Sequence, residues 1–193
     1  LAFSSYKEFS NVLNDRILQQ LNSIKTLKKN QIEHLIKSEW EKFETSEFYT
    51  QNWDSALVKL PDSIKKTNGI HDFTPYQVNK KTTIGFVLNT KRGTKIKILD
   101  YNKIKKILFE RTGMGNSGES YLVGEDCRLR SQSRFYPNTI PYKLSVKAEN
   151  IVNVFKGKNV AAIRKDYRGI EVYSVSSRIA IPNLKMVILS EID

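Results

Sequence analysis

The sequence has little of what disulfides and metal sites are built from. Cys127 is its only cysteine, which excludes an internal disulfide, and a lone thiol in a turn is typical of an incidental residue. Its two histidines, His34 and His71, have no cysteine or carboxylate cluster at ligand spacing, so we expect no structural metal site and no cofactor.

Long hydrophobic runs are missing as well. No stretch approaches the ~20 apolar residues that a membrane helix needs, and no signal peptide is recognisable. The chain starts at Leu1 rather than at a methionine, so we expect it to be a piece of a longer protein. An apolar content of 39% with 10% aromatics is typical of a folded protein, and 193 residues suffice for one large or two small domains.

The net charge of +12 has three interpretations: a solvated lysine-rich surface, contact with lipid headgroups, or nucleic-acid binding. The basic residues are spread along the chain in short pairs, without the aromatic interleaving of RNA-recognition surfaces. We therefore favour the solvated surface, place lipid contact second, and expect no nucleic-acid partner.

The most informative stretch is residues 113–135, GMGNSGESYLVGEDCRLRSQSRF. Its three early glycines predict a loop. Alternation then predicts a strand over 119–123 and a second strand over 128–133, joined by a turn into a hairpin. The Gly-x-Gly-x-x-Gly spacing is not a dinucleotide site, because it follows a predicted helix and opens a strand instead of the reverse.

Hydrophobic periodicity predicts the remaining elements. Apolar residues at three- or four-residue steps, with no glycine or proline, predict one helix over residues 4–44, about 60 Å long. Strands are expected over 82–89 and 94–99. The other predicted elements are short helices over 54–66 and 102–111, a helix over 143–156, and strands over 158–165, 169–179 and 185–192. Two strands, a helical crossover and three antiparallel strands is the order of PAS domains.

Residues 113–135 resemble the membrane-proximal segment of Cache sensor domains. These are the extracytoplasmic domains of bacterial chemoreceptors, sensor histidine kinases and receptor cyclases. The DYRG of residues 166–169 and the final EID of residues 191–193 are similar to that family too, as is the DFTPY of residues 72–76. Between the two serines, where the family usually has an acidic residue, this chain has Gln132. The resemblance implies an α+β fold: a long N-terminal helix, a PAS-like antiparallel five-stranded sheet and a reduced distal lobe.

On this basis we expect three parts. Residues 1–44 form a stalk helix, 45–101 a reduced membrane-distal lobe, and 102–193 a membrane-proximal PAS-like domain. The alternative for residues 45–101 is an N-terminal elaboration of a single Cache domain.

A PAS-like sheet holds its ligand between its concave face and the crossover segment. The expected ligand-binding residues on that face are Tyr121, Ser131, Ser133, Arg134, Tyr142, Tyr167 and Tyr173. Arg130 and Arg134 could clamp a carboxylate, because a guanidinium offers paired donors, and Arg134 is the favoured residue. The alternative is that Ser131, Ser133 and Arg134 only tie the strand to the crossover loop. Asp166 and Arg168 are expected to stabilise a turn.

The functional expectation is a non-catalytic sensing domain of a transmembrane receptor, on the periplasmic or extracellular side of the inner membrane. It would bind a small molecule such as a carboxylate or an amino acid, and it would be anchored through flanking membrane helices. The second hypothesis is a structural or dimerisation module without a ligand, with a homodimer left open. A nucleic-acid function rests on charge alone.

Overall fold

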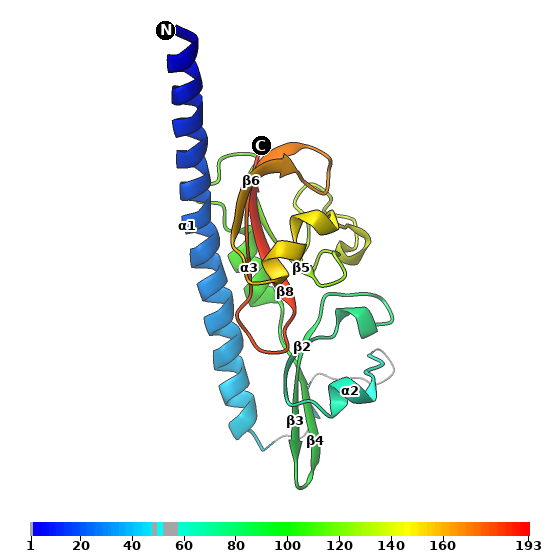
Figure 1. Cartoon of the computed structure of the whole chain (residues 1–193). Coiled ribbons are helices and arrows are strands. Elements are labelled where there is room, and N and C mark those ends of the chain that lie inside the picture. The colour runs from blue at the N-terminus through cyan, green and yellow to red at the C-terminus, as the bar shows by residue number, and fades with distance from the viewer. Residues whose placement is uncertain (1, 48–49, 52–57) are drawn as a thin grey trace.

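The computed structural model of the chain describes residues 2–47, 50–51 and 58–193. Helix α1 (Ala2–Thr45) runs through 44 residues, about 66 Å at 1.5 Å per residue. It confirms the single helix predicted from periodicity. In Figure 1, α1 lies beside the proximal strands, its N-terminal turns extend beyond them, and the β3–β4 turn extends past its other end. No helix of the described residues is both long and apolar enough to cross a membrane.

Only part of the apolar stripe of α1 is covered. Leu21, Ile32, Ile36 and Phe43 are buried, at intervals of whole helical turns, against the strands. Tyr6, Phe9, Val12 and Leu13 lie in the N-terminal turns and are exposed. The stripe therefore anchors the C-terminal two thirds of the helix to the strands and leaves its N-terminal third uncovered.

The strands form two four-stranded sheets. The distal sheet has the order β1-β4-β3-β2, and the proximal sheet has the order β5-β8-β7-β6. The distal strands are β1 (Thr50–Gln51), β2 (Gly69–Asp72), β3 (Ile84–Thr90) and β4 (Gly93–Ile98). The proximal strands are β5 (Glu119–Gly124), β6 (Val160–Lys165), β7 (Glu171–Arg178) and β8 (Met186–Ile192). The α+β class is as predicted, and β5, β6, β7 and β8 follow the strands predicted over 119–123, 158–165, 169–179 and 185–192.

The predicted strand over 128–133 is wrong. This segment makes only isolated bridges, Val123 to Leu129 and Arg128 to Ser145, so the proximal sheet of the described residues has four strands instead of five. The backbone bonds of this segment to β5 are limited to the Gly124 N–H with the Arg128 carbonyl and the Arg130 N–H with the Leu122 carbonyl. The Ser131 hydroxyl accepts the Leu122 N–H at 2.9 Å, where a regular strand would offer a carbonyl.

The predicted helix over 143–156 is wrong too. It is replaced by 3₁₀ turns at Pro141–Lys143 and Ala148–Asn150 and by the short helix α4 (Val152–Phe155). The Leu129 N–H donates to the Leu144 carbonyl, and the Val146 N–H donates to the Cys127 carbonyl. These bonds hold residues 144–146 in an extended conformation beside residues 127–129. Their backbone groups are therefore not free to form the first turn of the helix predicted over 143–156.

The other helices follow the prediction in part. Helix α3 (Asn102–Phe109) lies within the predicted 102–111. Of the helix expected over 54–66, only α2 (Asp62–Lys65) is observed, after Pro61, and residues 54–57 lie outside the described part of the chain.

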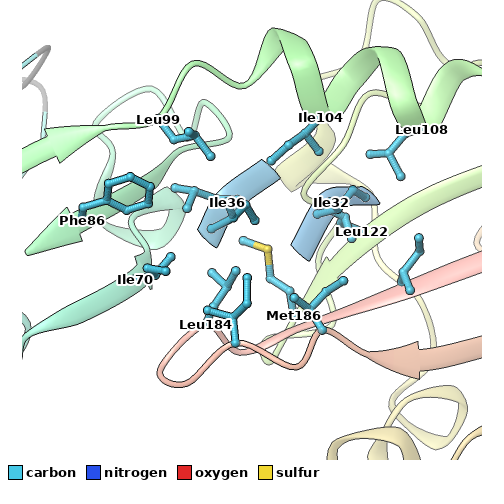
Figure 2. Close-up of a cluster of buried hydrophobic side chains, with 14 of the residues drawn as sticks. Ile32, Ile36, Ile70, Phe86, Leu99, Ile104, Leu108, Leu122, Leu184 and Met186 are labelled. Carbon is cyan, nitrogen blue, oxygen red and sulfur yellow. The ribbon is translucent and has the colours of Figure 1, made fainter. Parts of the chain in front are cut away.

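One hydrophobic cluster joins both sheets to the helices. Figure 2 shows Ile32 and Ile36 of α1 together with Phe86 of the distal sheet and Met186 of the proximal sheet. Ile104 and Leu108 of α3, Leu122 of β5 and Leu184 complete the same cluster. The core is therefore continuous from one sheet to the other, and it fixes the relative position of the residues that lie between them.

Candidate functional site

The face of the proximal sheet turned away from α1 carries two buried carboxyl groups. Glu119 of β5 and Glu191 of β8 are directly opposite each other in the antiparallel register, and both are under 10% exposed. The Tyr121 hydroxyl donates to Glu191 Oε2 at 2.7 Å, and the Ser174 hydroxyl donates to Glu191 Oε1 at 2.7 Å. Burial raises the pKa of Glu191 to about 7, against these two hydrogen bonds, which lower it.

Glu119 has its own set of donors. Its Oε1 accepts the Arg134 backbone N–H at 2.8 Å, and its Oε2 accepts the Tyr167 hydroxyl. The Ser133 hydroxyl lies 2.6 Å from the Tyr167 hydroxyl oxygen and continues the chain of hydrogen bonds. Burial raises the pKa of Glu119 in spite of these donors. Tyr121, Ser133 and Tyr167 thus do meet on the predicted face, but around two carboxyl groups of the protein itself.

This face is closed by apolar side chains. Tyr121 and Val123 pack with Leu129, Val154 and Leu189 in one buried cluster. None of the five best-defined cavities among the described residues is lined by Tyr121, Ser131, Ser133, Tyr167 or Tyr173. Their assignment as ligand contacts stays a prediction, and their observed contacts are internal.

Two of the predicted residues are placed elsewhere. Tyr173 lies on the opposite face of the sheet, because it is paired with Ile163 and Ile192 in the register and its hydroxyl donates to Asn14 Oδ1 of α1 at 2.6 Å. Its expected position on the concave face is wrong. The Ser131 hydroxyl accepts the backbone N–H of Leu122 in β5, so its observed contact is with the sheet and not with the crossover loop.

Asp166 and Arg168 form the expected turn pair. Asp166 accepts the Arg168 backbone N–H at 2.7 Å and the Arg168 Nε–H at 2.5 Å. Arg168 also reaches Asp193 at 2.6 Å, so the turn between β6 and β7 is tied to the last residue of the chain.

An open cleft of about 680 Å³ lies where the two sheets meet. Its walls come from α2, β2 and the adjoining 3₁₀ turn on one side, and from the 125–130 loop, Tyr142 and Lys185 on the other. Polar residues of both charge signs line it: Asp72, Glu125, Asp126, Arg130 and Lys185. It is the largest of the five cavities and lies on the boundary between the sheets.

Arg130 lies in the wall of this cleft and is only 1% exposed. Its Nε donates to Asp72 at 2.7 Å, its Nη2 donates to Asp126 at 2.9 Å, and its Nη1 donates to the Arg128 carbonyl at 2.9 Å. Burial alone would lower the pKa of Arg130, but the two carboxylates outweigh it and hold the pKa above its usual value. Arg130 does bind carboxylates, but they are Asp72 and Asp126 of the protein itself, and a contact with a ligand carboxylate stays a prediction.

Gly124 makes room for that guanidinium. A Cβ at this position would lie 2.3 Å from Arg130 Nη2, closer than any real contact. The glycine that ends β5 therefore leaves room for the arginine, whose guanidinium would have to shift if this residue had a side chain. This gives a physical reason for the glycine in the YLVG part of the sequence motif.

Tyr142 faces the cleft next to Arg130. The guanidinium carbons of Arg128 and Arg130 each lie 5.1 Å from its ring centroid, and Lys80 Nζ lies 5.4 Å from it. Cation–π attraction thus brings three cations from two segments of the chain to this ring. Of the seven predicted site residues, Tyr142 is the one that lines this cleft.

Arg134 lines a different and smaller cavity, of about 150 Å³, beside the C-terminal end of α3 and the start of β5. The described residues contain no group of three or more His, Cys, Asp or Glu side chains that could hold a metal ion.

The sequence prediction missed the acidic residues of both sites. Asp72, Glu119, Asp126 and Glu191 all stand inside the motifs that carry the Cache resemblance, which was the available signal. Alternation within β5 could have placed Glu119 beside Tyr121, two residues away on the same face.

No protein-family model and no curated protein matches this chain. Solved structures do. The ligand-binding domain of the Pseudomonas fluorescens chemoreceptor CtaA, in complex with L-isoleucine, superposes with a TM-score of 0.59 at 13% identity, over 95% of this chain and 94% of that chain.

Two further receptor domains are similar. The ligand-binding domain of the Pseudomonas aeruginosa chemoreceptor PctC, in complex with GABA, gives a TM-score of 0.56 at 10% identity, over 91% of this chain and 99% of that chain. The periplasmic sensory domain of the Campylobacter jejuni chemoreceptor Tlp1 gives 0.56 at 12% identity, over 96% and 91%. The chain therefore has the fold of periplasmic chemoreceptor sensor domains, which confirms the resemblance seen in the sequence.

Proposed function

We propose that this chain is the extracytoplasmic small-molecule sensing domain of a transmembrane receptor, such as a chemoreceptor or a sensor histidine kinase. The fold shared with the CtaA, PctC and Tlp1 domains supports this assignment. So does the arrangement of the chain ends. The N-terminal turns of α1 and the C-terminus lie toward the same end of the molecule in Figure 1, as a domain anchored on one membrane face requires. The domain senses and does not catalyse.

The observation that carries the proposal is the cleft between the sheets, with Arg130 buried in its wall. It offers carboxylates and cations side by side, and it has an aromatic ring in Tyr142. An amino acid carries one charge of each sign and is complementary to such a lining. The amino-acid and GABA complexes of CtaA and PctC support this ligand class.

The position of the cleft supplies a route for signalling. Asp72 belongs to β2 of the distal sheet, whereas Arg130 and Asp126 follow β5 of the proximal sheet. Strand β5 pairs along its length with β8, which ends one residue before the C-terminus. A ligand that binds more tightly to one arrangement of these ion pairs shifts the population toward it and displaces the terminal strand.

A thermal-shift screen tests the proposal. The 193-residue protein is screened against L-amino acids, GABA, short carboxylates and amines. A ligand at a hundred times its Kd should add about 2.7 kcal/mol to the apparent free energy of unfolding. The hit is then titrated by calorimetry against Tyr142→Ala, which should bind about tenfold more weakly because it loses the ring that faces the cleft.

Tyr6→Ala is the matched control, since Tyr6 is 72% exposed on the N-terminal turns of α1. It should bind the same ligand with unchanged affinity. If no compound of the panel raises the melting temperature, or if Tyr142→Ala binds as tightly as the parent protein, the cleft is not the sensing site.

A second candidate function, a dimerisation module without a ligand, is favoured by the exposed apolar residues of α1. Tyr6 and Phe9 are 72% and 67% exposed, and Leu13 follows one turn later. Sedimentation analysis separates the two functions. A homodimer that dissociates in Tyr6→Ala/Phe9→Ala, together with no response to the ligand panel, would favour this alternative.

A further inference from the structure

We propose that the cavity beside Arg134 is a second binding site, separate from the cleft, for a short-chain carboxylate. The cavity measures about 150 Å³ and lies between the end of α3, the start of β5 and the segment after Ser131. A cavity of about this volume accommodates benzene, so it has room for about six heavy atoms. The ligand is therefore a compact molecule, smaller than the occupants that the cleft can hold.

The charge at this cavity is supplied by two arginines. Arg134 uses its Nη1 to donate to the Gly118 carbonyl at 2.6 Å, and this bond fixes the guanidinium at the wall of the cavity. Arg111 approaches from the loop after α3 and is exposed. Neither arginine takes part in an ion pair within the part of the chain that the structure describes. Both guanidiniums therefore keep donors for a ligand carboxylate.

The carboxyl group in the wall does not compete for these donors. Both oxygens of Glu119 are already engaged by the Arg134 backbone N–H and the Tyr167 hydroxyl, and the residue is only 6% exposed. Burial also raises the pKa of Glu119, so this carboxyl group is more readily neutral than an exposed one. The guanidinium side chains thus set the charge that a ligand meets.

The remaining lining decides the rest of the ligand. Leu108 and Phe109, from the last turn of α3, present apolar surface to the cavity, and Gln132 adds one amide. A ligand with its carboxylate toward the arginines and a short hydrocarbon chain toward α3 matches the charged and apolar parts of this lining. Carboxylates of two to four carbons have about four to six heavy atoms and fit this volume, so propionate, in the middle of that range, is the natural probe.

The site would act on the proximal half of the domain alone. It joins α3, β5 and the segment that leads to the crossover, whereas the cleft joins the two sheets. The protein would then have two separate inputs, and the second does not depend on the assignment of the cleft.

The test is a titration of the ¹⁵N-labelled 193-residue protein with sodium propionate, followed by amide chemical shifts, with sodium chloride as the ionic control. Propionate should shift the amides of Gly118, Glu119 and Arg134 saturably. Propionamide, which has the same shape without the charge, should not. Arg134→Ala should weaken binding by about 10- to 100-fold, the size of a lost charge-assisted hydrogen bond.

Three further variants make the result decisive. Arg111→Ala should weaken binding without affecting the fold, since this side chain is exposed. Arg92→Ala removes the same charge at the tip of the β3–β4 turn and should change nothing. Tyr142→Ala, which alters the cleft, should leave propionate binding intact. Equal binding of propionamide, no saturable shift, or unchanged affinity in both Arg134→Ala and Arg111→Ala would overturn the proposal.

Discussion

Glu119 and Glu191 stand opposite each other on neighbouring strands, an arrangement that destabilises a sheet when both groups are charged. The protein places a tyrosine hydroxyl on each of them and buries both. A buried carboxyl group retains its proton to higher pH because ionisation in an apolar surrounding is costly. The pKa of Glu191 accordingly rises to about 7, with Asp166 adding to the effect of burial.

The raised pKa of Glu191 predicts a specific pH dependence. The folded state binds the proton more tightly than the unfolded state, whose carboxyl has its ordinary pKa of 4.5. This group's contribution to stability is therefore fully present below pH 4.5 and is lost as the pH rises through about 7. Glu191→Gln removes this titrating group. The free energy of unfolding of the variant, relative to that of the parent protein, should therefore increase by about 3 kcal/mol as the pH rises from 4.5 through about 7.

Urea unfolding at half-unit steps from pH 4.5 to 8 measures the difference. Glu149→Gln is the control, because Glu149 is exposed, and its difference from the parent should stay flat. A constant difference between Glu191→Gln and the parent protein over this range would show that Glu191 is not protonated in the fold near neutral pH.

Single residues also show where sequence-based prediction stops. Alternation correctly put Tyr121 and Val123 on one face of β5, since that depends only on the strand itself. It could not place Arg130, because the partner of its Nε is Asp72, 58 positions earlier and in the other sheet. Contacts between distant segments decide the destination of a long charged side chain, and local pattern carries no information about them.

At the scale of elements, Lys28 joins three of them. This residue of α1 is only 2% exposed. It donates to the carbonyls of Leu108 and Glu110 at the C-terminal end of α3, and to the Ser120 hydroxyl of β5. A cation at a helix C-terminus satisfies carbonyls that have no partner within the helix and complements its dipole. Burial lowers the pKa of this lysine to about 8.

Lys28→Met should destabilise the protein by about 1–3 kcal/mol, the cost of leaving buried acceptors without a donor, although methionine keeps much of the side-chain volume. Lys37→Met, on an exposed position of the same helix, is the matched control and should change stability by less than about 0.5 kcal/mol. Chemical denaturation of both variants gives the comparison. Equal stabilities of the two would mean that the lysine contacts contribute nothing to holding α3 against α1.

Elements were predictable where local pattern was sufficient. The length of α1 follows from its uninterrupted periodicity, and β6, β7 and β8 follow from alternation and turn residues. Residues 143–156 have a helical apolar spacing as well, but their backbone is bonded to Cys127 and Leu129 instead. Tertiary hydrogen bonds outweighed periodicity there, and at residues 128–133 the backbone pairing with β5 ends at Arg130, after which the Ser131 hydroxyl accepts the Leu122 N–H.

For the whole molecule, the division into residues 1–44, 45–101 and 102–193 stays a prediction about independent folding. The contacts connect these parts closely. Helix α1 packs on β7 and β8 of the proximal sheet and on β3 of the distal sheet, and one hydrophobic cluster includes side chains from all three parts. A shared core predicts that the two sheets unfold together as one cooperative unit.

Phe86→Ala tests this cooperativity. Phe86 of the distal sheet is fully buried, with ring centroids 5.6 Å from Trp40 and 5.7 Å from Phe43 of α1. Its truncation should destabilise the fold by about 3–5 kcal/mol. If the sheets unfold together, the slowest-exchanging amides of β5 and β8 should lose the same free energy of protection as those of β3, because both exchange through global unfolding.

The control is Val78→Ala, an exposed position also in the distal half, which should alter the protection of neither set of amides. Loss confined to β2, β3 and β4 would instead show that the distal sheet opens by itself, and the two halves of the sensor would then be coupled only by contacts such as Asp72–Arg130.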